Sequence, residues 1–100
     1  MMQKAFLVVT EWDNDHGRES QVDLFLHALK AISHGKEIVE NYLQKSKIKR
    51  GSFTGSWDEL YEDEFESGYT FESTYGDAVF YVHVYEKEFN DQVVENKEVI

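Results

Sequence analysis

The chain of 100 residues contains no cysteine and no proline. The lack of cysteine excludes disulfide bonds, thiolate zinc sites and cysteine nucleophiles. No apolar run approaches the roughly 20 residues of a membrane-spanning helix, and the run AFLVV is too short for the apolar core of a signal peptide. We therefore expect one cytoplasmic domain over residues 1–100, without membrane contact, in which residues 90–100 form a frayed tail or a short docked element.

Positive charge is scarce in the second half of the chain. The net charge is −10, and residues 51–100 hold two Lys and thirteen Asp or Glu, whereas residues 1–50 hold eight Lys or Arg and seven Asp or Glu. A surface of this kind repels nucleic acid and attracts basic partners. We expect a basic protein surface as the partner and no direct binding of nucleic acid.

Three segments have the alternation of a β-strand. In residues 4–12, KAFLVVTEW, both faces are mostly apolar, which is typical of a central strand. Residues 68–74 and 78–89 are rich in aromatic and β-branched side chains and predict a hairpin that turns at Gly76.

The spacing of apolar residues predicts helices in other segments of the chain. Val22, Phe25, Leu26, Leu29 and Ile32 fall on one face of a helix over residues 21–33, which Gly35 would end. Residues 36–46 predict a second helix, and a short third helix is expected to begin at about Ser56.

These elements predict an α+β fold in the order β-α-α-(α)-β-β. We expect a mainly antiparallel sheet of three or four strands with two or three helices packed on one face, and the first strand beside the last. A small sheet of this kind has open edges, so a homodimer is a further expectation.

The loop EWDNDHGRES, residues 11–20, combines four carboxylates with His16. It does not have the spacing of a calcium loop, because Gly17 comes one position early and the required glutamate is absent. We expect no metal there and interpret the segment as a turn, with Trp12 and Arg18 as a secondary contact.

Motifs for catalysis are also missing. No nucleophile elbow or phosphate loop is present, so we expect neither an enzyme nor a cofactor. An alternative hypothesis is a small-molecule or catalytic pocket between sheet and helices around His83, lined by Tyr69, Phe71, Tyr81 and Tyr85.

The segment WDELYEDEFESGYTFE, residues 57–72, has seven acids and no base. On a helix, carboxylates four residues apart repel each other, so the crowding does not help folding. A solubilising surface would explain it, and so would a contact with a basic partner. The contact would comprise Trp57, Asp58, Glu59, Tyr61, Glu62, Asp63, Glu64, Phe65 and Glu66.

The leading hypothesis is a small protein-binding module. In its sharpest form it is an inhibitor of the phage or mobile-element type that mimics nucleic acid and blocks a basic nucleic-acid-binding protein. The other hypotheses are the pocket around His83 and a structural or assembly subunit.

Overall fold

The computed structural model describes residues 2–14, 17–53 and 58–90. These residues form one α-helix, α1, one 3₁₀ turn, η1, and five strands. Their bounds are β1 Met2–Asn14, β2 Gly17–Phe25, α1 Ala28–Ser46, η1 Arg50–Ser52, β3 Glu59–Glu64, β4 Tyr69–Tyr75 and β5 Ala78–Asn90.

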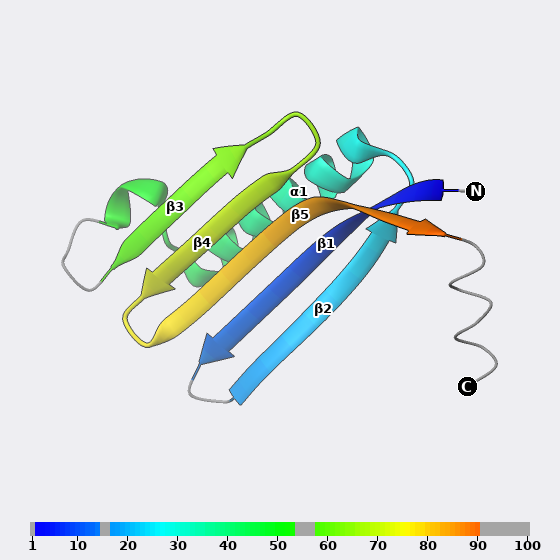
Figure 1. The fold of residues 1–100 in the computed structure, drawn as a ribbon. Helices are drawn as coiled ribbons and strands as arrows, with labels where there is room; N and C mark the ends of the chain where they lie inside the picture. The colour runs from blue at the N-terminus through cyan, green and yellow to red at the C-terminus, as the bar shows by residue number, and fades with distance from the viewer. Residues whose placement is uncertain (1, 15–16, 54–57, 91–100) are drawn as a thin grey trace.

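The five strands form one antiparallel sheet in the order β2-β1-β5-β4-β3. Figure 1 shows α1 behind the sheet. In the sequence, α1 stands between the β1–β2 hairpin and the β3–β4–β5 meander. The expected sheet of three or four strands with two or three helices is therefore wrong, as is the order β-α-α-(α)-β-β. The expected neighbours, first strand and last strand, are confirmed by the pairing of β1 with β5.

The helix predicted over residues 21–33 is wrong in its first half. Residues 17–25 form β2, which pairs with β1 so that Leu24 lies opposite Leu7 and Val22 opposite Val9. The segment QVDL alternates polar and apolar residues, so it also has the period of a strand. Pairing with an existing strand satisfies the backbone of β2 and decides between the two patterns.

The two helices predicted around Gly35 are one helix. Gly35 lies inside α1 and is buried, and a Cβ atom built there would come within 2.7 Å of Val84 Cγ2 on β5. The glycine therefore allows the helix to approach the sheet closely and does not end it. The helix ends at Ser46, and Lys47 follows in the left-handed conformation with φ 58°.

The short helix predicted from Ser56 is also wrong. Residues 54–57 lie outside the described residues, and Glu59–Glu64 form β3, paired with β4. A strand sends neighbouring side chains to opposite faces. The acidic residues of β3 are thereby divided between two surfaces, whereas a helix would have stacked them at four-residue intervals.

The strand prediction for residues 4–12 and the hairpin prediction for residues 68–89 are confirmed. The first lies within β1, and β4 and β5 pair antiparallel around Gly76, whose φ is +62°. Positive φ is the conformation that a tight hairpin turn requires and that glycine adopts without strain.

The hydrophobic core lies between α1 and the face of the sheet that it packs against, which we call the covered face. Buried side chains of α1 pack against buried side chains of β1, β5 and β4, which are the three central strands of the sheet. The strands β2 and β3 lie at its edges. The buried core comprises Phe6, Val8, Ala31, Ile32, Val39, Leu43, Tyr69, Phe71, Phe80, Val82 and Val84.

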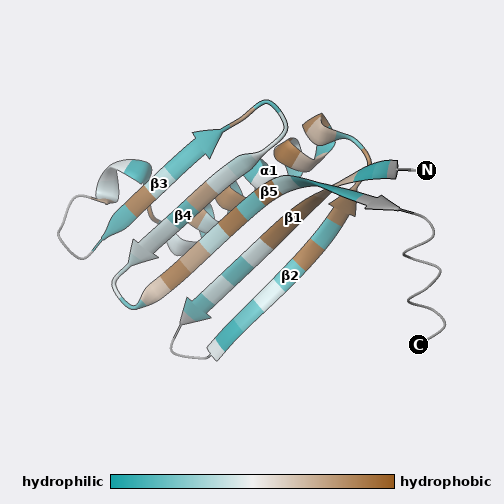
Figure 2. Ribbon diagram, in the orientation of Figure 1, coloured by the Kyte–Doolittle hydropathy of each residue, from teal (hydrophilic) through white to brown (hydrophobic). Residues whose placement is uncertain are grey.

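The opposite side of the sheet, which we call the uncovered face, carries no helix from residues 2–14, 17–53 or 58–90. Side-chain alternation and the strand registers place on it residues 7 and 9 of β1, 22 and 24 of β2, 59, 61 and 63 of β3, 70, 72 and 74 of β4, and 81, 83 and 85 of β5. Figure 2 is viewed from this side and shows that β3 is mostly hydrophilic, whereas β1 has a long hydrophobic stretch. Among the described residues, no helix is long and apolar enough to cross a membrane.

Candidate functional site

The acidic tract singled out in the sequence is divided by β3 into two sets. Glu62 and Glu64 project to the covered side, whereas Glu59, Tyr61 and Asp63 project to the uncovered face. The nine residues proposed as a single contact therefore do not share one surface.

Glu62 is held by a network of hydrogen bonds and ion pairs. Arg50 binds it in a bidentate manner, with Nε 2.8 Å from Oε1 and Nη2 3.0 Å from Oε2, and Arg50 Nη1 also lies 2.9 Å from Glu40 Oε1. The buried Tyr69 hydroxyl donates a hydrogen bond to Glu62 as well. The bonds from Arg50 lower the pKa of Glu62, and burial together with the bond to Glu62 raises the pKa of Tyr69. Glu62 is thus an ionised structural residue.

Glu64 forms an ion pair with Lys36 of α1. Among the described residues, the Lys and Arg side chains that pair with the tract come from the first half of the chain, about 12 and 28 positions earlier in the sequence. The excess of acid along residues 57–72 is therefore smaller in space than in sequence, since two of its carboxylates are neutralised on the covered side.

Residues toward the ends of the acidic tract make neither of these ion pairs. Asp58 Oδ1 accepts a hydrogen bond from the backbone N–H of Gly76 at 3.0 Å, and Phe65 and Glu66 lie exposed in the β3–β4 turn. The backbone N–H of Phe65 is 2.8 Å from the carbonyl oxygen of Gly68, which closes this turn. Trp57 lies outside the described residues.

The uncovered face has an acidic and aromatic half over β3, β4 and β5. Glu72 Oε2 lies 2.8 Å from His83 Nε2, and the rings of His83 and Tyr81 are 6.0 Å apart. Tyr61 stands opposite Glu72 in the register and is 52% exposed. The carboxylate of Asp63 raises the pKa of the Tyr61 hydroxyl, which therefore remains protonated and can donate a hydrogen bond.

The residues of the alternative pocket around His83 lie on two sides of the sheet. Tyr69 and Phe71 are buried beneath α1 on the covered face. His83, Tyr81 and Tyr85 are on the uncovered face. The structure brings the last three together along β5, and it separates them from the first two by the thickness of the sheet.

The other half of the uncovered face, over β1 and β2, is apolar. Val22 is 59% exposed and Leu24 62% exposed, and they pair with Val9 and Leu7. Tyr85, 44% exposed, lies opposite Leu7 on the next strand. Sequence reasoning missed this surface because it assigned Val22 to a helix, although the period-two alternation of QVDL could have revealed it.

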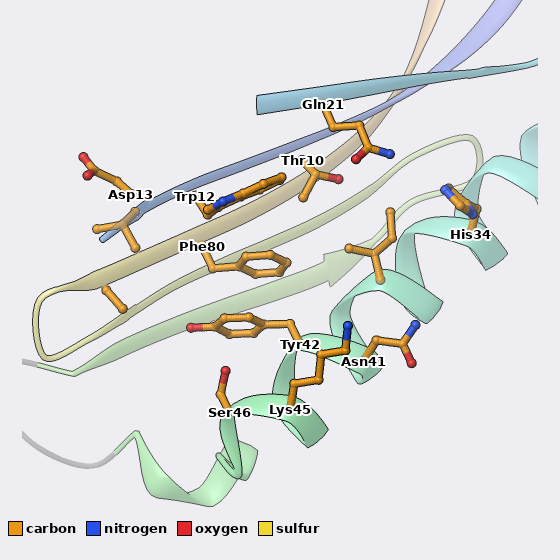
Figure 3. A pocket seen from close by; sticks show the side chains of 13 residues that line it. Thr10, Trp12, Asp13, Gln21, His34, Asn41, Tyr42, Lys45, Ser46 and Phe80 are labelled. Atoms are coloured by element: carbon orange, nitrogen blue, oxygen red, sulfur yellow. The ribbon is translucent and has the colours of Figure 1, made fainter. Parts of the chain in front are cut away.

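A cavity of about 560 Å³ lies on the covered side, between α1 and the paired strands β1 and β5. Its aromatic walls are Trp12, Tyr42 and Phe80, and Thr10, His34 and Lys45 also line it (Figure 3). The Tyr42 and Phe80 rings are stacked, with centroids 3.9 Å apart and planes 3° from parallel. Burial raises the pKa of the Tyr42 hydroxyl, which stays protonated at neutral pH. No local sequence signal predicts this cavity, because its walls converge from separate elements.

The secondary contact proposed in the loop is at the end of the β1–β2 hairpin. Arg18 Nη2 lies 3.3 Å from Asp13 Oδ2, and Trp12 points to the covered side. Both residues line a hollow together with Glu11, Val79 and Tyr81. His16 lies outside the described residues, and in the part of the chain that the structure describes no group of three or more His, Asp or Glu could hold a metal ion.

Comparisons of this chain with protein-family models, with curated proteins and with solved structures found no match.

Proposed function

We propose that the protein is a protein-binding module that engages a basic protein surface through the uncovered face. The observation that carries the proposal is that this face combines exposed apolar side chains with carboxylates that face solvent. Val22 and Leu24 are more than half exposed, although they lie in β2, which is paired with β1. Apolar and aromatic anchors surrounded by polar groups are typical of protein interfaces.

The charge of the face supports a basic partner. The uncovered face defined above carries the carboxylates of Glu59, Asp63 and Glu72. The same alternation extends it to two further carboxylates and two cations: Glu11, Asp13, Arg18 and Lys87. Within residues 2–14, 17–53 and 58–90, Glu59 and Asp63 have no ion pair. With a net charge of −10, two copies of the chain repel each other, which favours a partner of opposite charge over a second copy.

The finer form of the proposal is that the partner is a nucleic-acid-binding protein. Carboxylates on the uncovered face would occupy the positions of phosphates, and Tyr61 and Tyr85 would supply anchors between them. Such a protein would inhibit its partner by competing with nucleic acid.

A matched pair of variants tests whether the face or the total charge is responsible. Glu59→Lys/Asp63→Lys changes the uncovered face, and Glu37→Lys/Asp77→Lys changes α1 and the β4–β5 turn, so both raise the net charge from −10 to −6. A fluorescent peptide of ten arginines is the probe. We expect the face variant to weaken binding at least about tenfold more than the control, and salt to weaken the binding that remains. Equal losses in the two variants would contradict the proposal.

The partner is then sought by affinity capture with the wild type and both variants. The supporting result is a basic protein retained by the wild type and the control, lost with the face variant, and displaced by nucleic acid. If salt releases the captured protein but nucleic acid does not, the partner is basic and the mimicry of nucleic acid is rejected. If sedimentation velocity shows a dimer that Leu24→Lys disrupts, the apolar half of the face binds a second copy of the chain. This result would overturn the proposal for that half.

A further inference from the structure

We propose that the cavity between α1 and the sheet binds a small planar aromatic molecule that carries one anionic group. The cavity lies on the covered side and the proposed protein contact lies on the uncovered face, so the sheet separates the two sites except at the end of the β1–β2 hairpin, where Asp13 borders both. Its volume of about 560 Å³ is within the usual range of small-molecule sites. Three kinds of observation support the inference: the shape of the walls, the charge at the rim and an unpartnered hydroxyl.

The walls are flat. Phe80 and Tyr42 lie parallel, with ring centroids 3.9 Å apart, and Figure 3 shows Trp12 on the other side of Phe80. The indole comes from β1, the phenyl ring from β5 and the phenol from α1. Phe80 and Tyr42 close each other's facing surfaces by their own stacking, so a flat ligand ring would gain from edge contacts with these rings in addition to burial.

The rim is cationic. Lys45, in the last turn of α1, lines the cavity beside Asn41. Of the other ionisable side chains in the lining, Asp13 pairs with Arg18, His34 pairs with Asp23, and burial raises the pKa of Tyr42, which stays protonated. In the described part of the chain Lys45 has no ion pair. An ammonium group of this kind selects a carboxylate, sulfonate or phosphate on the ligand.

The third observation is the Thr10 hydroxyl. Thr10 is 4% exposed, and its Oγ1 has no hydrogen-bond partner in the residues that the structure describes. Figure 3 shows this oxygen directed toward the side of the cavity where Gln21 and His34 lie. Buried hydroxyls almost always have a partner, and valine would fill the same space without the cost of an unmet hydrogen bond. A polar atom of the ligand at the inner end of the cavity would satisfy Thr10.

The test uses the full chain with Trp57→Phe, so that Trp12 is the one remaining tryptophan. The probe is 2-naphthoate, and naphthalene-2-methanol is its neutral analogue with the same rings. We expect saturable quenching of Trp12 fluorescence by the anion, with the neutral analogue bound about tenfold more weakly. Lys45→Gln should weaken the anion about tenfold and leave the neutral analogue nearly unchanged.

Lys30→Gln is the matched control, because it removes the same charge from the exposed side of the same helix.

Thr10→Val gives a second readout. It should raise the melting temperature of the ligand-free protein by about 4–8 °C and yet weaken the binding of 2-naphthoate.

Two results would overturn the proposal. One is the absence of saturable quenching up to the solubility limit of 2-naphthoate. The other is an equal effect of Lys30→Gln and Lys45→Gln, which would show that the anion responds to the total charge and not to the cavity. Both results leave the protein-binding proposal standing, because the arginine peptide reports on the other face.

Discussion

The same strand, β3, supplies carboxylates to both faces of the sheet, and they have different fates. On the covered side, Glu62 meets Arg50 and Glu64 meets Lys36. On the uncovered face, Glu59 and Asp63 meet no cation among the described residues. The difference teaches that the charge of a segment becomes a surface property only after alternation and packing have sorted its residues. Variants that treat the two faces separately can sharpen or break this comparison.

The largest expected effect concerns aromatic residues on the two faces. Phe71 on β4 is fully buried against α1, so Phe71→Ala should lower the free energy of unfolding by about 3–5 kcal/mol through lost burial and a cavity. Tyr61 on the uncovered face is 52% exposed, and Tyr61→Ala should change that free energy by less than about 0.5 kcal/mol. Urea unfolding followed by circular dichroism measures both. Similar losses in the two variants would mean that the uncovered face is in fact packed.

Glu62 should contribute the next largest effect. Glu62→Ala leaves the hydroxyl of the buried Tyr69 without its acceptor and Arg50 with Glu40 alone, and should cost about 2 kcal/mol at pH 7. Glu62→Gln keeps an acceptor for Tyr69 and should cost less. The comparison of the two variants separates the hydrogen bond from the charge.

The difference in stability between the wild type and Glu62→Gln should depend on pH, because the pKa of Glu62 is lowered from its usual value of 4.5. A carboxyl group whose pKa is lower in the folded state stabilises the fold above its unfolded pKa, and this stabilisation is lost as the pH falls through the folded pKa. The difference between wild type and Glu62→Gln should therefore be full at pH 7 and shrink below about pH 4.5. A difference that is constant from pH 7 to pH 3 would contradict the charged network.

Gly35 tests how closely α1 approaches the covered face. Gly35→Ala should destabilise the protein by about 1 kcal/mol, because overpacking against Val84 outweighs the better helix propensity of alanine. In the double variant with Val84→Ala, the new methyl group fills space that the valine has vacated. A double-mutant cycle in urea should then give a favourable interaction of about 1 kcal/mol, whereas strict additivity would reject the close contact.

The smallest effect compares two carboxylates of β3 directly. Glu64→Gln removes an exposed ion pair with Lys36 and should cost about 0.5 kcal/mol at low salt and less at high salt. Glu59→Gln removes a carboxylate without an ion pair in the described residues and should leave stability unchanged or slightly raised. Thermal unfolding at two salt concentrations measures both. A larger loss with Glu59→Gln than with Glu64→Gln would reverse the assignment of the faces.

Local patterns predicted some elements well because the local signal agreed with the long-range pairing. The hairpin around Gly76 has alternating side chains in both arms and a residue that accepts positive φ. Residues 21–33 failed because Val22, Phe25 and Ile32 satisfy a helical period by coincidence, while Val22 and Leu24 satisfy a strand period as well. Only the presence of β1 as a neighbour decided between the two periods.

The candidate sites could be predicted less well than the strands. The acidic tract was visible in the sequence, yet its pairing with Arg50 and Lys36 depends on where α1 crosses the sheet. The cavity unites Thr10, Tyr42 and Phe80 from three elements, and none of these residues has a local signature of a site.

The sequence by itself determined the acidity of the second half, the absence of cysteine chemistry, the central strand and the hairpin around Gly76. These depend on composition, on period-two alternation and on turn residues, which are local properties of the chain. The tertiary structure alone decided that residues 17–25 form a strand, that one helix covers one face, and which carboxylates remain available to a partner. Those outcomes depend on pairing and packing between residues far apart in sequence, where the burial of apolar surface and the matching of charges are decided together.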